Sequence, residues 1–211
     1  VFRCREDAPR GTVDRETQLK PMEEASIRRE CDLQRRCSDA MGGAFVIACD
    51  EPVIHGGFGY VLSELGSDSI QGPLDEVGAL APWLAVPWFR DMVISVRSCH
   101  RTGVLHRDLD PGNFIFVATR EARLTGKAHP ATAKLTDFGQ AAPLASLGDE
   151  PVGWLKGKPP YWAPELAEAF LEEERPPYSP ATDMYTLGAC LCEMLTGSGP
   201  VFRKEEEELQ E

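Results

Sequence analysis

The stretch His106-Arg107-Asp108-Leu109-Asp110-Pro111-Gly112-Asn113 decides the fold of this chain, together with two shorter stretches that follow it. These are Asp137-Phe138-Gly139 and Ala163-Pro164-Glu165, and a strongly apolar segment after them carries an acidic residue, Asp183. Each short motif alone is a weak signal. Three motifs in this order and at this spacing rarely arise by chance, so we interpret them as one functional constellation.

The motifs resemble the catalytic loop, the metal-binding loop and the end of the activation segment of the eukaryotic protein kinase family, in its serine/threonine-like form. The resemblance implies an α+β, two-lobed fold, with a β-sheet and one helix in the first lobe and a mainly helical second lobe. We expect residues 1–211 to form a single partial kinase domain. Residues 1–63 would be a partial first lobe, 64–73 the hinge region and 74–211 a partial second lobe, so both lobes are expected to be incomplete.

Hydrophobic periodicity predicts the regular elements of this plan. The expected helices cover 21–37, 88–102, 165–174 and 182–195. The last is apolar enough to be buried, and Gly197 is suited to end it. The expected strands cover 45–49, 59–62, 114–117 and 133–135. Loops are expected over 66–86, which could include short helices, and over 118–132 and 140–165.

Three residues are implied to carry the chemistry. Phosphoryl transfer requires a positioned acceptor and metal ions across the phosphates, and little covalent chemistry from the protein. The resemblance implies that Asp108 orients the substrate hydroxyl and accepts its proton, while Asn113 and Asp137 hold the metal. The implied cofactors are ATP and Mg²⁺, which prefers hard oxygen ligands. Capping of a turn by one aspartate is the alternative for each residue alone, and it accounts poorly for all three together.

Other positions are implied to contact the nucleotide. Glu64 and Leu65 match the hinge whose backbone meets adenine, with Ser63 just before them. The helix 182–195 is implied to support the catalytic loop, because Asp183 is expected to form hydrogen bonds with the backbone of that loop. A helix N-cap is the plain alternative for that aspartate.

The phosphate-binding parts depart from the family's pattern. No Gly-rich phosphate loop is found, and Arg3 stands where the family has a strand lysine. A guanidinium is longer and planar, so this exchange is not conservative. The helix carboxylate that would pair with it is best placed at Glu30, with Glu23 and Glu24 as rivals. A solvated helix charge is an equal interpretation of Glu30.

A further departure concerns two charged residues. The family usually has Lys two residues after the catalytic aspartate and Thr in the segment before Ala-Pro-Glu, whereas this chain has Asp110 and Lys158 there. We hypothesise that Lys158 reaches across to Asp110, which replaces the usual contact by an ion pair of reversed polarity. Two independent losses are the alternative. The hypothesis requires the Lys158 amine to lie within hydrogen-bonding reach of Asp110.

Two residues of the loop are expected to have supporting roles. His106 is expected to pack with Phe138 and not to act as a general base. Arg107 matches a position that often receives a phosphorylated loop residue in the family. Carboxylates at 149–150 could neutralise that arginine without phosphorylation, and Ser146 is the rival acceptor of a phosphate.

Composition restricts the partners. The net charge of −12 argues against nucleic acid and anionic membranes, which attract clustered Lys and Arg. No stretch approaches the 18 or so apolar residues of a membrane span. Seven cysteines without a CxxC pair predict free thiols and an intracellular, cytoplasmic location. The sequence does not indicate an oligomeric state.

Three functions follow. The first is ATP-dependent phosphoryl transfer to Ser or Thr of protein substrates, which the set Asp108, Asn113 and Asp137 favours. The second is a catalytically impaired pseudokinase that acts as a binding scaffold, which Arg3 and Asp110 favour. The third is a small-molecule phosphotransferase, since such enzymes share the His-x-Asp-Leu-x-Pro-Gly-Asn run. The other two motifs speak against this third reading.

Overall fold

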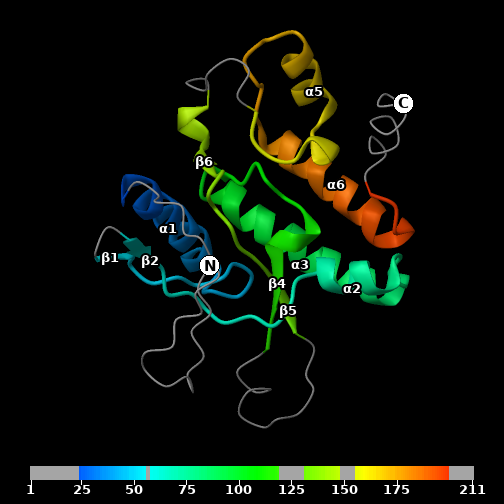
Figure 1. Ribbon diagram of the computed structural model, residues 1–211, viewed down its shortest axis with the longest axis horizontal. Coiled ribbons are helices and arrows are strands. Elements are labelled where there is room, and N and C mark those ends of the chain that lie inside the picture. The colour runs from blue at the N-terminus through cyan, green and yellow to red at the C-terminus, as the bar shows by residue number, and fades with distance from the viewer. Residues whose placement is uncertain (1–23, 56–57, 119–130, 148–154, 200–211) are drawn as a thin grey trace.

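The computed structural model describes residues 24–55, 58–118, 131–147 and 155–199, which form an α+β domain (Figure 1). The α-helices are α1 (Glu24–Asp39), α2 (Gln71–Val77), α3 (Pro82–Arg101), α5 (Pro164–Leu171) and α6 (Pro180–Thr196). The strands are β1 (Val53–His55), β2 (Phe58–Tyr60), β3 (Val104–Leu105), β4 (Phe114–Val117), β5 (Thr132–Leu135) and β6 (Ala142–Pro143). Short 3-10 helices cover Pro111–Asn113, Leu144–Ser146 and Pro159–Tyr161.

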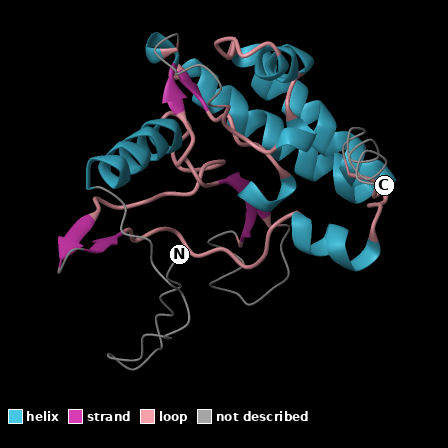
Figure 2. Cartoon of the chain, turned by 45° about the horizontal axis from the view of Figure 1, so that its top comes forward, coloured by secondary structure: helices cyan, strands magenta, loops and turns pink. Residues whose placement is uncertain are grey.

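The strands form antiparallel pairs, β1 with β2, β3 with β6 and β4 with β5, which lie apart in Figure 2. The β4–β5 pair confirms the prediction for 114–117 and 133–135. The strand predicted over 45–49 was wrong as a regular strand. Only isolated bridges occur there, a parallel one between Val46 and Leu135 and an antiparallel one between Cys49 and Ser63. The strand predicted over 59–62 is the shorter β2.

Helix α1 confirms the helix predicted near 21–37, and residues 21–23 lie outside the described part of the chain. Its buried side carries Ile27, Cys31, Leu33 and Cys37. The C-terminal end of α1 packs on α3, where the Ser98 hydroxyl donates to the Cys37 carbonyl at 2.9 Å. Helix α1 is therefore fixed to the centre of the molecule.

Helix α3 begins at Pro82, earlier than the predicted start at residue 88. Pro87 lies just before the predicted start, and a proline inside a helix donates no backbone hydrogen bond and crowds the preceding turn. Here Pro82 occupies the first turn, where its missing N–H costs nothing, and the helix continues through Pro87. Burial of Ala85 and Met92 on one face favours this continuation.

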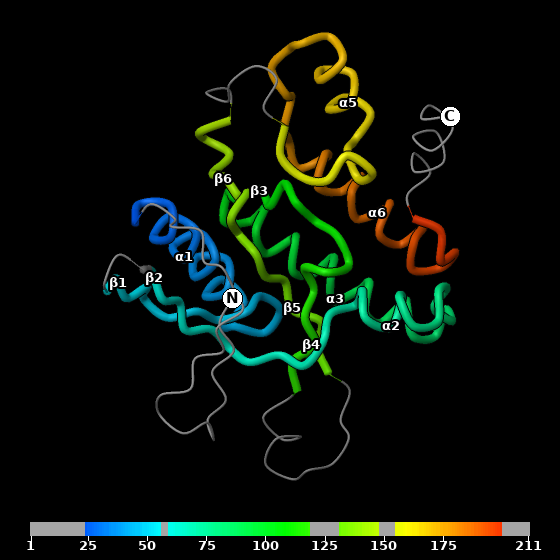
Figure 3. Tube along the Cα trace, in the orientation of Figure 1, coloured from blue at the N-terminus to red at the C-terminus, as the bar shows by residue number. Residues whose placement is uncertain are grey.

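The segment between β2 and α2 is more ordered than the predicted loop 66–86. Phe116 in β4 exchanges backbone hydrogen bonds with it: the Phe116 N–H donates to Asp68 at 2.7 Å, and its carbonyl accepts from Ser67 at 2.9 Å. Figure 3 shows this segment passing beside β4 before α2 begins. The predicted hinge region is thus attached to the strand that follows the motif loop.

Helix α6 confirms the predicted helix 182–195 and its end at Gly197, but it begins at Pro180, two residues before the predicted start. Ser179 and Thr182 form a capping box, and Gly197 ends the helix in the left-handed region at φ 67°. A side chain at Gly197 would lie 2.6 Å from the backbone nitrogen of Ala79, so this position has no room for one. The predicted burial holds for one face of the helix only. Leu187 and Met194 are fully buried, whereas Met184 and Leu195 are exposed.

The helix predicted over 165–174 is α5, which ends at Leu171. The continuous core contains buried side chains from α1, α3, β4, β5 and α6. Helix α3 lies in its middle, between α1 and α6 (Figure 1). None of the helices in the described residues is long and apolar enough to cross a membrane.

Candidate active site

The loop between β3 and β4 carries the catalytic motif, and a side chain of α6 binds the backbone of this loop. Asp183 in α6 is 2% exposed and accepts the backbone N–H groups of His106 and Arg107, both at 3.0 Å. Its Oδ2 also lies 2.8 Å from Nε2 of His100. Arg107 has φ 68°, a strained value for a residue with a side chain. The predicted contact of Asp183 with the loop backbone is confirmed.

Asn113 and Asp137 are brought together by the β4–β5 pair. Asn113 immediately precedes β4, and the Thr136 N–H that follows β5 donates to the Asn113 carbonyl at 3.0 Å. The Asn113 side chain donates to the Asp108 carbonyl at 2.8 Å. Because Asp137 follows Thr136, the predicted catalytic residues Asp108, Asn113 and Asp137 gather at one end of this strand pair.

Negative charge accumulates at this end. Burial raises the pKa of Asp108; neighbouring Lys158 lowers it, and Asp110 and Asp137 add to the rise. Oδ1 of Asp108 is buried and has no hydrogen-bond partner among the described residues. Burial and then Asp137 raise the pKa of Glu30 in α1 as well. A cation bound here would relieve both the repulsion and the unsatisfied oxygen.

The donor set fits Mg²⁺. In the described ranges, no three His, Cys, Asp or Glu side chains converge as a metal cage. Magnesium needs no such cage, because it usually takes one or two carboxylates and completes its shell with phosphate oxygens and water. The amide oxygen of Asn113 and the carboxylate of Asp137 are ligands of the right kind. Asp137 has φ 63°, and its Oδ1 accepts the Gly139 N–H at 3.3 Å.

Lys158 forms an ion pair with Asp110, so the hypothesis of a reversed pair is confirmed. The Asp110 side chain is only 5% exposed, whereas that of Lys158 is 55% exposed. Oδ1 of Asp110 also accepts the Gly112 N–H at 2.6 Å, and its Oδ2 lies 3.3 Å from the Asn113 amide nitrogen. Asp110 is therefore both the cap of a 3-10 turn and the anchor of Lys158.

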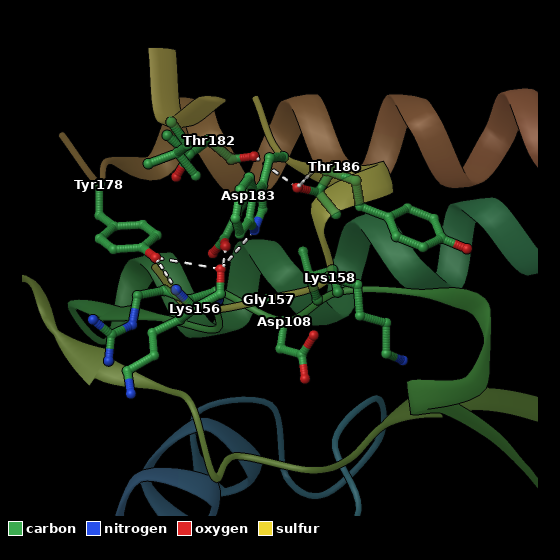
Figure 4. A pocket seen from close by; sticks show the side chains of 13 residues that line it. Asp108, Lys156, Gly157, Lys158, Tyr178, Thr182, Asp183 and Thr186 are labelled. Atoms are coloured by element: carbon green, nitrogen blue, oxygen red, sulfur yellow. Dashed lines mark hydrogen bonds between the residues drawn. The ribbon is translucent and has the colours of Figure 1, made fainter. Parts of the chain in front are cut away.

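The segment that carries Lys158 lies against the catalytic loop (Figure 4). Gly157 adopts φ 83°, and a side chain there would come within 2.5 Å of the Arg107 carbonyl. The carbonyl of Lys156 accepts from the Trp162 indole at 3.0 Å. The Tyr178 hydroxyl forms hydrogen bonds with both the backbone N–H and the backbone carbonyl of Lys156. A shallow pocket between loop and segment is lined by Asp108, Lys158 and residues from α6.

The predicted hinge residues Glu64 and Leu65 differ in their surroundings. The Glu64 N–H donates to the Ala48 carbonyl at 2.8 Å, and its carboxylate pairs with Lys134 at 2.7 Å. Leu65 is exposed. Sequence reasoning missed Lys134, which also donates to the Gly43 carbonyl at 2.6 Å. A lone lysine in a strand gave no signal of a partner seventy positions earlier.

The structure distinguishes between the carboxylates of α1 that were candidates to pair with Arg3. Glu24 forms an exposed pair with Arg28 at 2.9 Å, as a solvated helix charge does. Glu30 instead lies beside the Asp137-Phe138-Gly139 turn, where its Oε2 would be 3.6 Å from a side chain added at Gly139. Arg3 and Glu23 lie outside the described residues, so the proposed pairing of Arg3 with Glu30 stays a prediction.

His106 and Phe138 pack as expected, in an edge-on contact with ring centroids 5.0 Å apart. Nε2 of His106 lies 3.1 Å from the Thr136 carbonyl, which fixes the ring between loop and strand. Arg107 donates to the Gln140 carbonyl at 2.7 Å and lies over the Tyr178 ring. The carboxylates predicted at 149–150 as its partners fall outside the described part of the chain.

Comparison with known proteins agrees with this geometry. The protein kinase domain family matches residues 12–211. The chain is 32% identical over 157 residues to probable serine/threonine-protein kinase zyg-1 of Caenorhabditis elegans, covering 74% of this chain and 20% of that protein. It is 35% identical over 144 residues to serine/threonine-protein kinase PkaA of Streptomyces coelicolor, covering 66% and 24% respectively. With human serine/threonine-protein kinase MRCK gamma it shares 32% over 123 residues, covering 58% and 7%.

An α+β domain whose acidic loop is held by a buried helix aspartate, beside a second acidic turn, has the architecture of the kinase class. With the family matched over most of its length, this chain belongs to the protein kinase domain family. It spans 7% to 24% of the length of the three relatives named above.

Proposed function

We propose that the protein transfers the γ-phosphoryl group of ATP to Ser or Thr hydroxyls of protein substrates. The observation that carries the proposal is the meeting of Asp108, Asn113 and Asp137 at one end of the β4–β5 pair. The serine/threonine specificity is supported by the similarity of the chain to serine/threonine-protein kinases. The gathered carboxylates give the site a preference for a cation, as an ATP-dependent reaction requires.

Each residue has a defined task in this reaction. The acceptor hydroxyl oxygen forms a bond to the γ-phosphorus while the bond to the β–γ bridging oxygen breaks, and ADP leaves. Asp108 orients the hydroxyl and accepts its proton, and its raised pKa makes it a better acceptor than an ordinary aspartate. Asn113 and Asp137 would hold Mg²⁺, which neutralises charge on the phosphate oxygens when bound.

The nucleotide would lie between the hinge and this site. Backbone groups at Glu64 and Leu65 are proposed to meet adenine, and the Glu64–Lys134 pair would keep that part of the chain in place. Arg3 is proposed to hold the α and β phosphates, and Glu30 is proposed to pair with Arg3. The position of Glu30 beside the Asp137 turn supports its part in this pairing.

MgATP binding measured by calorimetry tests the proposal, with Asp137→Ala as the decisive variant. We expect binding by the unchanged protein and a loss of at least about tenfold in Asp137→Ala, because one metal ligand is removed. Asp39→Ala, at the exposed end of α1, is the matched control and should bind normally. Phosphate transfer to a mixture of Ser- and Thr-containing peptides should then follow. Normal binding by Asp137→Ala would refute the assignment of the metal site.

A scaffold without efficient turnover is the second candidate. One observation favours it: Asp110 places an additional carboxylate beside Asp108, which disfavours an incoming phosphate. The same experiment separates the candidates, because a scaffold of this kind would bind MgATP, or fail to bind it, without transferring phosphate to any peptide in the mixture.

A further inference from the structure

Four carboxylates surround the place where the phosphates of a nucleotide would arrive. Asp110 and Asp137 both contribute to the raised pKa of Asp108, and burial and then Asp137 raise the pKa of Glu30. A terminal phosphate brought into this group would meet like charge on several sides. A protein cation beside this group would reduce that repulsion further than a metal ion alone.

Lys158 is the basic side chain that the described structure pairs with this group. Its amine bonds Asp110, and Figure 4 shows its side chain projecting in the same direction as that of Asp108. Burial lowers the pKa of Lys158, but the hydrogen bond and charge of Asp110, with Asp108 and Asp137, raise it by more. Lys158 is therefore charged throughout the neutral range. Lys134 in β5 is held elsewhere, by Glu64 of the hinge.

The position of Lys158 is fixed by contacts that do not involve its own charge. Helix α6 holds the catalytic loop through Asp183 and holds the Lys158 segment through Thr186, whose hydroxyl donates to the Tyr161 carbonyl at 2.9 Å. The Tyr161 hydroxyl bonds the buried Glu193 of the same helix at 2.5 Å. Loop and segment are thus aligned on one helix, and the Lys158–Asp110 pair crosses between them.

We infer that Lys158 is the phosphate-binding cation of this site, supplied by the segment, and that Asp110 is the positioning residue that holds it there. The inference rests on the proposed function. An ammonium group has three donors, and Asp110 accepts one of them. The half-exposed side chain leaves the other donors free to meet a phosphate oxygen. The reversed pair thereby keeps a positive charge at the catalytic loop although the loop itself carries an aspartate.

The test compares the affinities for ATP and ADP, both with Mg²⁺, because only ATP brings a γ-phosphate. Calorimetry is done on the protein, on Lys158→Gln and Lys158→Arg, and on Asp110→Asn. Lys158→Gln should weaken ATP binding about tenfold and ADP binding less than about twofold, the effect of one charge-assisted hydrogen bond. Lys158→Arg should recover most of the loss. Arg90→Gln, an exposed loss of the same charge on α3, is the control and should leave the ratio unchanged.

Asp110→Asn is the most decisive variant, because two interpretations of Asp110 predict opposite changes in the affinity for ATP. Removal of a carboxylate near a phosphate should strengthen ATP binding if only the sum of charges matters. If Asp110 positions Lys158, ATP binding should instead weaken by about threefold or more while the asparagine still caps Gly112. Thermal unfolding of each variant verifies that it is folded.

The outcomes are distinct. An ATP-to-ADP affinity ratio that is unchanged in Lys158→Gln, or that rises in Asp110→Asn, overturns the inference and leaves the proposed function intact. Failure of the unchanged protein to bind either nucleotide overturns the proposed function itself, and the inference with it. A fall of the ratio in both variants, with recovery in Lys158→Arg, establishes the assignment.

Discussion

At the scale of single residues, Asp108 carries a charge that the fold disfavours and that the proposed reaction requires. Its carboxylate is partly buried, has one oxygen without a partner among the described residues, and lies near two other aspartates. Burial and these neighbours disfavour its charged form, which a proton acceptor requires. The fold therefore holds Asp108 in a state that is unfavourable for stability.

Asp108→Asn should therefore raise the free energy of unfolding at pH 7, by less than about 1 kcal/mol because the group is partly exposed to solvent. The folded-state pKa of Asp108 is raised, so the folded state retains this proton at a pH where the unfolded state has lost it. The penalty of Asp108 is then absent below the unfolded-state pKa and complete above the folded-state one. Urea unfolding at pH 7 and near pH 3 should show the gain only at the higher pH.

Asp50→Asn, at an exposed position, is the matched control and should show no gain at either pH. A destabilised Asp108→Asn at pH 7 would contradict the view that the charge of Asp108 is a burden to the fold.

Single residues also mark how far the sequence could lead. The Asp110–Lys158 pair could be predicted because two departures from one family pattern had opposite charges. The Glu64–Lys134 pair could not be predicted, since neither residue departs from the family pattern. The contact depends on how the strand and the hinge pack. Long-range pairs become predictable only where a pattern constrains both partners.

At the scale of elements, the segment carrying Lys158 depends on a single glycine. Gly157 has a left-handed backbone, and its α-carbon faces the Arg107 carbonyl so closely that a methyl group would overlap with it. This close approach lets the segment lie on the catalytic loop. Any side chain at residue 157 should separate the two.

Gly157→Ala should lower the free energy of unfolding by about 1–3 kcal/mol and expose the segment. Gly188→Ala is the matched control, because Gly188 lies inside α6 with no atom within 4 Å of the added methyl group. That substitution should stabilise by about 0.5–1 kcal/mol through helix propensity. Urea unfolding measures both values, and limited proteolysis reports exposure of residues 155–162. Equal effects of the two substitutions would show that the segment is not held by this contact.

Element boundaries were predictable where the chain carries end signals and not elsewhere. Gly197 was predicted to end α6, and the structure follows it, whereas the helix begins with Ser179 as its cap, before the predicted start at residue 182. The start of α3 was predicted too late, at residue 88, and the helix runs through Pro87 because burial of one helix face outweighs the lost hydrogen bond. Residues 45–49 have strand-like composition but only isolated bridges, since their pairing depends on Leu135 far along the chain.

At the scale of the whole molecule, one core joins the parts that were predicted as separate lobes. Buried side chains of α1, among them Leu33 and Cys37, belong to the same cluster as Met194 in α6. Helix α3 lies between them and contributes Met92 and Val96, both fully buried. The catalytic loop follows α3 after the short strand β3. The geometry of the site therefore depends on the packing of this central helix.

Met92→Ala should destabilise the whole described domain by about 2–5 kcal/mol, because it leaves a cavity in the centre of the core. Since the core is continuous, α1 and α6 should lose protection from hydrogen exchange together and by the same free energy. Trp83→Ala on the same helix is the matched control: the indole is 74% exposed, so its removal should change stability by less than about 0.5 kcal/mol. Hydrogen exchange measured by mass spectrometry compares α1 with α6 in each variant. If α1 opened in Met92→Ala while α6 kept its protection, the two sides would be independent units, and the position of Glu30 beside Asp137 would not be secured by α3.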